Sequence, residues 1–145
     1  MTARKSSPTP TPTAPPCPCG RPLTLAACCG RWLAGPLHLQ APDAQALMRS
    51  RYSAFVLEQA HYLLATWHTS TRPAALDFEP GLRWLGLQVR SCRQIDAEQA
   101  TVEFVARSKL AGRAGRAGRA HRLHELSRFV CERGRWFYLD GQPLA

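Results

Sequence analysis

The stretch AQALMRSRYSAFVLEQAHYLLATWH, residues 44–68, decides the fold. Its apolar side chains recur every third or fourth position, the spacing of a helix with one buried face. The members of this stripe are Ala44, Leu47, Met48, Tyr52, Phe55, Val56, Ala60, Leu63, Leu64 and Trp67. Asp43 can cap the helix start by accepting a free backbone N–H. We expect a break near residues 57–59 and an end near His68.

From Arg83 onward the apolar period falls to two, which is typical of strands. The alternating apolar positions are Leu85, Leu87, Val89, Val102, Phe104, Ala106, Leu123, Phe129, Cys131, Phe137 and Leu139. Turn residues at 96–98 and 133–135 separate runs that should pair as antiparallel neighbours. Helices followed by strands predict an α+β fold in which an antiparallel sheet packs on helices.

Two charged side chains fall close to the expected core. Arg51 lies beside the helical stripe, and Glu125 alternates with the apolar residues of the third strand. A buried charge needs a partner, because unpaired burial is costly. We therefore predict an ion pair between Arg51 and Glu125, with Trp67 and His124 nearby. Glu125 would be a general acid or base if these residues line a pocket. The alternative, which we favour, is a structural pair that joins helix to sheet.

The segment CPCGRPLTLAACC at 17–29, which precedes this helical stretch, holds four of the six cysteines: Cys17, Cys19, Cys28 and Cys29. Four thiolates at this spacing can converge on one tetrahedral zinc ion, and such a closed site is structural. The competing interpretation, disulfides between the two pairs, needs an oxidising compartment. The zinc interpretation is favoured because no apolar leader starts the chain. The other two cysteines, Cys92 and Cys131, are predicted to be small core residues.

Two segments have no apolar periodicity. Residues 1–16 are rich in proline and threonine and are expected to form a disordered tail. Ala111–Arg119 repeats Ala-Gly-Arg three times and is expected to be a flexible hairpin loop. In a chain of net charge +9, these arginines allow nonspecific nucleic-acid contact. The alternative, a tolerated low-complexity insertion, is favoured.

Several classes of protein are not indicated. No run approaches the roughly 20 apolar residues that a membrane span needs, so we expect a cytoplasmic protein without a membrane span. The sequence shows neither a nucleophile elbow nor a glycine loop of phosphate-binding form. Enzymatic activity is left open, with the absence of activity favoured.

Six motifs, in this order and spacing, resemble the YchJ-like family of uncharacterised bacterial proteins. They are CPCG…CCG at 17–30, ALMRSRYSAFVL at 46–57, YLLATWH at 62–68, RWLGLQV at 83–89, TVEFVAR at 101–107 and HELSRFV…RWFYLDG at 124–141. The resemblance implies a zinc knuckle similar to the SEC-C motif at 17–35. It also implies a cone-shaped domain similar to nuclear transport factor 2 at 43–141.

The resemblance carries no established activity. It implies that the knuckle contacts a partner protein, as the similar motif of the preprotein translocase motor does. This chain departs from the usual CPCGSG pattern at Arg21 and Pro22, within the loop that would make such a contact. Two functions remain, an adaptor or binding module that acts through the knuckle, and a cone that binds or transforms a small molecule. The first is favoured.

Overall fold

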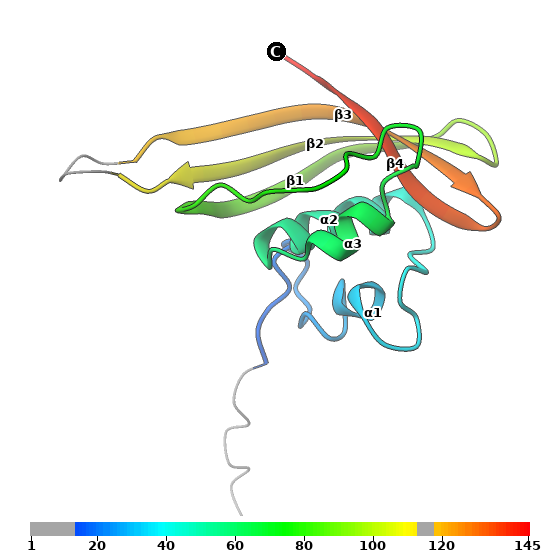
Figure 1. The fold of residues 1–145 in the computed structure, drawn as a ribbon, viewed down its shortest axis with the longest axis horizontal. Helices are drawn as coiled ribbons and strands as arrows, with labels where there is room; N and C mark the ends of the chain where they lie inside the picture. The colour runs from blue at the N-terminus through cyan, green and yellow to red at the C-terminus, as the bar shows by residue number, and fades with distance from the viewer. Residues whose placement is uncertain (1–13, 113–117) are drawn as a thin grey trace, which may run out of the picture.

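The computed structural model describes residues 14–112 and 118–145. Its helices and strands follow one another along the chain (Figure 1): α1 Gly30–Leu33, α2 Ala44–Val56, α3 Ala60–Ala65, β1 Leu82–Gln94, β2 Gln99–Leu110, β3 Ala120–Glu132 and β4 Arg135–Pro143. The strands form one antiparallel sheet in the order β1-β2-β3-β4. Helices packed on a curved antiparallel sheet confirm the predicted α+β class.

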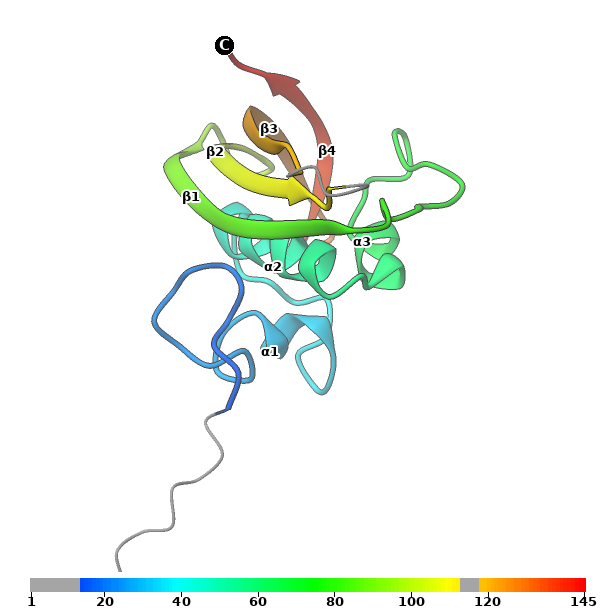
Figure 2. The same ribbon diagram turned by 90° about the vertical axis from the view of Figure 1, so that its left-hand side faces the viewer.

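The molecule is layered, and α2 is its middle layer. The curved sheet covers one side of α2 and α3, while α1 and the cysteine segment lie on the side of α2 away from the sheet (Figures 1 and 2). Two sides of α2 are therefore covered by protein. This explains why nine of its thirteen residues are buried.

The local signals of the helical stretch act as predicted. The side chain of Asp43 accepts a hydrogen bond from the Ala46 backbone at 2.7 Å, which satisfies one of the free N–H groups of the first turn of α2. The helix ends at Val56, and Glu58 adopts a left-handed conformation with φ 55°. Because this conformation cannot continue a right-handed helix, α3 starts afresh at Ala60.

The core lies between α2 and the concave face of the sheet. Three predicted positions of β2, Val102, Phe104 and Ala106, are buried, as is Phe129 of β3. Leu47 of α2 and Leu63 of α3 complete the same cluster from the helical side. The period-two pattern of β2 and the helical stripe thus identify the two surfaces that meet.

The expected apolar face of β1 is partly wrong. Leu85 is 56% exposed, while Trp84 packs against the core in its place. The register of the β1–β2 pair shifts between Trp84 and Gly86, so an extra residue on β1 reverses the alternation there. Leu87 and Val89, beyond the bulge, return to the core side as predicted.

The prediction that Cys92 and Cys131 are core residues is also wrong. Cys92 is exposed and Cys131 is only partly buried. Both lie near the ends of their strands, and the last five residues of β1 are all exposed. Apolar character alone did not distinguish the middle of a strand from its uncovered end.

The turns and the segments without periodicity complete the chain. Arg133 and Gly134 have φ values of 53° and 76°, which match the tight hairpin turn predicted between β3 and β4. Of the expected tail, only residues 14–16 are described, and Leu25 N–H donates to the carbonyl of Pro15 at 3.0 Å. The centre of the Ala-Gly-Arg loop, residues 113–117, lies outside the described residues. No described helix is long and apolar enough to cross a membrane.

Candidate metal centre and ligand pocket

Four cysteine side chains meet on the side of α2 away from the sheet. Cys17 and Cys19 come just before a turn at Gly20, which has φ 90°, and Cys28 and Cys29 come just before α1. All four residues are buried, and their sulfur atoms lie within 4.8 Å of one another. The two cysteine pairs, eight residues apart in the sequence, are therefore brought into one cluster.

The spacing of the sulfur atoms fits a bound metal ion. Thiolate–metal bonds of about 2.3 Å in a tetrahedral site place the sulfur atoms about 3.8 Å apart. The Sγ atoms of Cys19 and Cys28 are 3.7 Å apart. The hydrogen bond from Cys29 lowers the pKa of the Cys19 thiol to about 4, whereas burial raises that of Cys28. The cluster can therefore hold a metal ion.

The cluster is anchored to α2. The Oγ atom of Ser53 lies 3.6 Å from the Sγ atom of Cys17. One turn earlier, Arg49 donates from Nη1 to the carbonyl oxygen of Cys19 at 2.9 Å. The four cysteines belong to the same buried cluster as Leu47 and Phe129. The cysteine cluster is therefore part of the common core.

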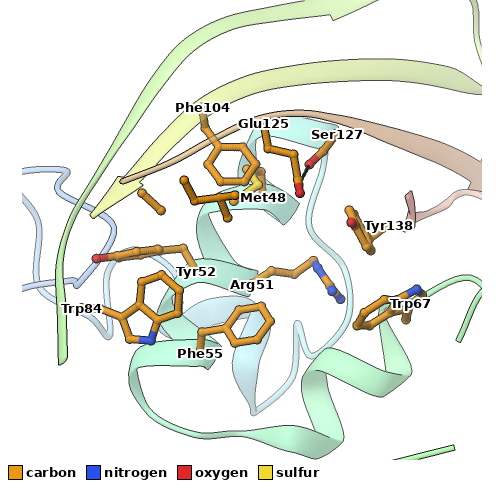
Figure 3. Close-up of a pocket in the computed structure, with 12 residues that line it drawn as sticks. Met48, Arg51, Tyr52, Phe55, Trp67, Trp84, Phe104, Glu125, Ser127 and Tyr138 are labelled. Atoms are coloured by element: carbon orange, nitrogen blue, oxygen red, sulfur yellow. Dashed lines mark hydrogen bonds between the residues drawn. The ribbon is translucent and has the colours of Figure 1, made fainter. Parts of the chain in front are cut away.

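On the other side of α2, a cavity of about 300 Å³ separates the helix from the concave face of the sheet. Figure 3 shows its apolar end, formed by side chains from α2, β1 and β2, and its polar end near β3 and β4. The lining consists of Met48, Arg51, Tyr52, Phe55, Trp67, Trp84, Phe104, Ala106, Leu123, Glu125, Ser127 and Tyr138. Six of these twelve side chains are aromatic, so the walls favour a flat or apolar occupant.

Arg51 is the most deeply buried cation of this pocket, with 4% of its surface exposed. Its Nη1 atom donates to the carbonyl of Leu63 at 2.8 Å and to the hydroxyl of Thr66 at 2.7 Å. The guanidinium carbon lies 4.5 Å from the ring centre of Tyr138 and 5.1 Å from that of Trp67. Burial lowers the pKa of Arg51 to about 10, so the side chain still carries its charge near neutral pH.

The predicted ion pair between Arg51 and Glu125 is wrong, although both residues line the pocket. Glu125 instead accepts a hydrogen bond from the Ser127 hydroxyl at 2.6 Å. The ion pairs among the described residues join other partners: His68–Glu132, His124–Glu103 and Arg128–Asp140. Sequence periodicity placed both charges on the correct faces. It could not give the distance between α2 and the sheet, which the cavity increases.

Of the two residues predicted to lie near this ion pair, one lines the pocket and the other does not. Trp67 lines the pocket and flanks Arg51. His124 does not line it, because adjacent residues of a strand point to opposite faces and Glu125 takes the cavity side. Its Nε2 atom instead lies 2.8 Å from Glu103 Oε2.

Two important pocket residues were missed, Trp84 and Tyr138. Trp84 was missed because the β-bulge between Trp84 and Gly86 reverses the alternation of side chains in β1. The second lies between Phe137 and Leu139, which were predicted to carry the apolar face of β4. Its neighbour Trp136 also packs against the core, so the alternation of Trp136 with Tyr138 was the signal that could have found it.

The protein therefore combines a domain in which a curved antiparallel sheet covers helices with a segment that carries a buried cysteine cluster. Residues 43–141 match the family model described as the YchJ middle domain, which is similar to nuclear transport factor 2 (NTF2-like). A UPF0225 protein of Polaromonas naphthalenivorans is 61% identical to this chain, and the match covers 87% of this chain and 96% of that protein. The chain therefore belongs to the UPF0225, or YchJ, family.

Solved structures show the same arrangement. A SEC-C motif containing protein from Rhodopseudomonas palustris aligns with a TM-score of 0.70 at 32% identity, covering 89% of this chain and 98% of that one. A SEC-C motif containing protein from Psychrobacter arcticus aligns with a TM-score of 0.67 at 28% identity, covering 92% of this chain and 84% of that one.

Proposed function

We propose that this protein binds a small organic molecule in the pocket between α2 and the sheet, and that the cysteine cluster holds a structural zinc ion. The observation that carries the proposal is the 300 Å³ cavity, whose aromatic walls enclose an arginine without an ion-pair partner among the described residues. A buried guanidinium whose remaining N–H groups face the cavity is costly unless a ligand accepts from them.

The donor set supports zinc over other metals. Four thiolates are the ligands of closed tetrahedral zinc sites, and such a site has no open position for a substrate. The sulfur spacing of 3.7 Å between Cys19 and Cys28 agrees with this assignment. Reduced thiols also fit the cytoplasm, where disulfides are rare.

A binding role agrees better with the pocket than a catalytic role. The serine that lines it, Ser127, donates to a carboxylate, and this arrangement does not activate a nucleophile as a histidine base would. Arg51 is held by Leu63 and Thr66, and Glu125 is held by Ser127, so both charged groups are positioned to bind a polar head group of a ligand.

An adaptor role for the cysteine segment has one specific observation in its favour. Leu23, in the loop between the two cysteine pairs, is 45% exposed and could contact a partner protein. Contact between nucleic acid and the Ala-Gly-Arg loop remains a prediction from sequence, since residues 113–117 lie outside the described part of the chain.

A fragment screen with a matched pair of variants tests the pocket. Ala106→Phe places a ring inside the cavity, and Ala120→Phe makes the same change at an exposed position of β3. Ligand-observed NMR should find fragments that bind the wild-type chain and Ala120→Phe equally. Ala106→Phe should weaken the same fragments by about tenfold or more. Failure of a broad library to yield a ligand, or equal binding by both variants, would contradict the proposal.

Elemental analysis tests the metal. Protein purified without chelator should carry one zinc per chain, and Cys28→Ser should lower that content because one of four ligands is lost. Zinc-free wild-type protein would show that the assignment is wrong.

A further inference from the structure

The polar end of the pocket holds two opposite charges that do not touch. Both hydrogen bonds of Arg51 leave from Nη1, so its Nε and Nη2 atoms have no protein acceptor among the described residues. Glu125 accepts from Ser127 through Oε2, and its Oε1 atom has no described donor. In Figure 3 both groups border the same space, beside Tyr138.

The position of Glu125 depends on a glycine in the neighbouring strand. A Cβ atom built at Gly141 would collide with the Glu125 carboxylate. Ser127, the direct β3 partner of Gly141, donates the hydrogen bond that fixes the same carboxylate. Two separate features therefore hold the carboxylate at the pocket wall, within the field of Arg51 but not in contact with it.

The pocket is already balanced in charge. One guanidinium and one carboxylate line it, and the two aromatic rings beside Arg51 further stabilise the cation. A net charge on a ligand would have to be removed from water and placed in a mostly apolar cavity, which is unfavourable without a free counter-ion. What the two charged groups lack is a hydrogen-bond acceptor for Arg51 and a donor for Glu125.

We propose that the ligand is a neutral, flat molecule with an amide-type head, whose carbonyl oxygen accepts from Arg51 and whose N–H donates to Glu125. This inference rests on the proposed small-molecule pocket. The apolar body would lie between the rings of Phe55, Trp84 and Phe104, which form the other end of the cavity. Carboxamides and cyclic lactams are the compounds that combine these features.

Three probes of nearly equal shape separate the possibilities: naphthalene carboxamide, which is neutral, the carboxylate, which is an anion, and the carboxamidine, which is a cation. Isothermal calorimetry near neutral pH should show the carboxamide binding wild-type protein about tenfold or more tighter than either charged probe. The apolar body is the same in all three, so the comparison isolates the head group.

A change of charge at position 125 provides a second measurement that a purely structural role would not move. Glu125→Gln keeps the size of the side chain and removes its negative charge. The pocket is then left with the positive charge of Arg51 alone, which favours an anionic ligand. The naphthalene carboxylate should then bind about tenfold tighter than it does to wild type. Glu98→Gln, the same change at an exposed turn residue, should leave all three affinities unchanged.

The outcomes separate this inference from the proposed function. Preferential binding of the carboxylate or carboxamidine to wild type would overturn the amide assignment and leave the pocket function standing. An unchanged order of affinities in Glu125→Gln would also overturn it. If none of the three probes binds, the inference fails, and the fragment screen then decides whether the pocket function fails with it.

Discussion

The two sides of α2 are both buried, but one is filled and the other is hollow. Towards the cysteine cluster, Arg49 and Ser53 each contact a cysteine. Towards the sheet, Arg51 and Phe55 border a 300 Å³ cavity. These residues share one short helix, so the difference does not come from helix propensity or from overall burial.

The contrast separates a structural site from a binding site. On the cysteine side, Arg49 Nη1 and Ser53 Oγ contact cysteines, and the core is continuous. On the sheet side, donors of Arg51 have no partner among the residues that the structure describes, which is costly unless another molecule accepts from them. Unused polar groups around a preformed space therefore locate a binding site more surely than burial does.

The largest effect that tests this contrast should come from losing the metal. Because the cysteines belong to the common core, Cys19→Ser should cost at least about 3 kcal/mol and lower Tm by roughly 10 °C or more. Cys92→Ser, at an exposed position, should change Tm little. Circular dichroism of the sheet gives the measurement. An unchanged transition in Cys19→Ser would instead support a domain at 43–141 that folds independently.

Next in size is the response to added volume on the two sides. Ala54→Leu adds a larger side chain to a fully buried position of α2 that does not line the cavity and should cost about 1–3 kcal/mol. Ala106→Leu makes the same change at the cavity wall and should stay within about 1 kcal/mol of wild type, since space exists there. Urea unfolding measures both, and equal losses would show that the cavity is too rigid or too small to accept added groups.

A smaller effect should follow from loosening the contact between α2 and the cysteines. Ser53→Ala removes the hydroxyl next to Cys17 and should weaken zinc binding by about tenfold, because groups that contact metal ligands tune the affinity. Ser50→Ala removes a hydroxyl that lies 2.6 Å from Tyr62 Oη and should reduce stability without changing zinc affinity. Competition with a chromogenic chelator measures both. Equal zinc affinities would separate Ser53 from the metal site.

The smallest effect should come from a surface pair outside both sides of α2. Arg128 donates from Nε to Asp140 at 2.6 Å, which holds the pKa of that carboxyl below its usual value. The pair therefore contributes stability above the unfolded pKa of about 3.9 and loses it as the pH falls through the lower folded pKa. Both side chains are exposed, so Asp140→Asn should cost less than about 1 kcal/mol at neutral pH. A larger loss in urea unfolding would contradict this.

Local signals in the sequence predicted the local structure well. The cap at Asp43, the break after Val56 and the turn at Arg133 and Gly134 each depend on a few neighbouring residues. The four cysteines were also grouped correctly, because their ligand chemistry restricts how they can be arranged.

The features that could not be predicted depend on distances between segments remote in sequence. The bulge between Trp84 and Gly86 reversed the face of Leu85, and the isolated Gly86 within β1 was a local signal that such a bulge could occur. Arg51 and Glu125 were placed at one pocket, yet whether they pair depends on the separation of helix and sheet, and this is fixed by many side chains together. Periodicity predicts the face of a helix or strand to which a side chain points, whereas the width of a cavity depends on the packing of the whole core.

The position of α2 between the two sites has a thermodynamic consequence. A single turn of this helix carries Ser53, which touches a cysteine, and Arg51 and Tyr52, which border the pocket. If zinc changes the affinity for the pocket ligand by some factor through this helix, the ligand must change the affinity for zinc by the same factor, because the coupling free energy is reciprocal. The same coupling free energy can then be measured either from ligand affinity with and without zinc or from zinc affinity with and without ligand.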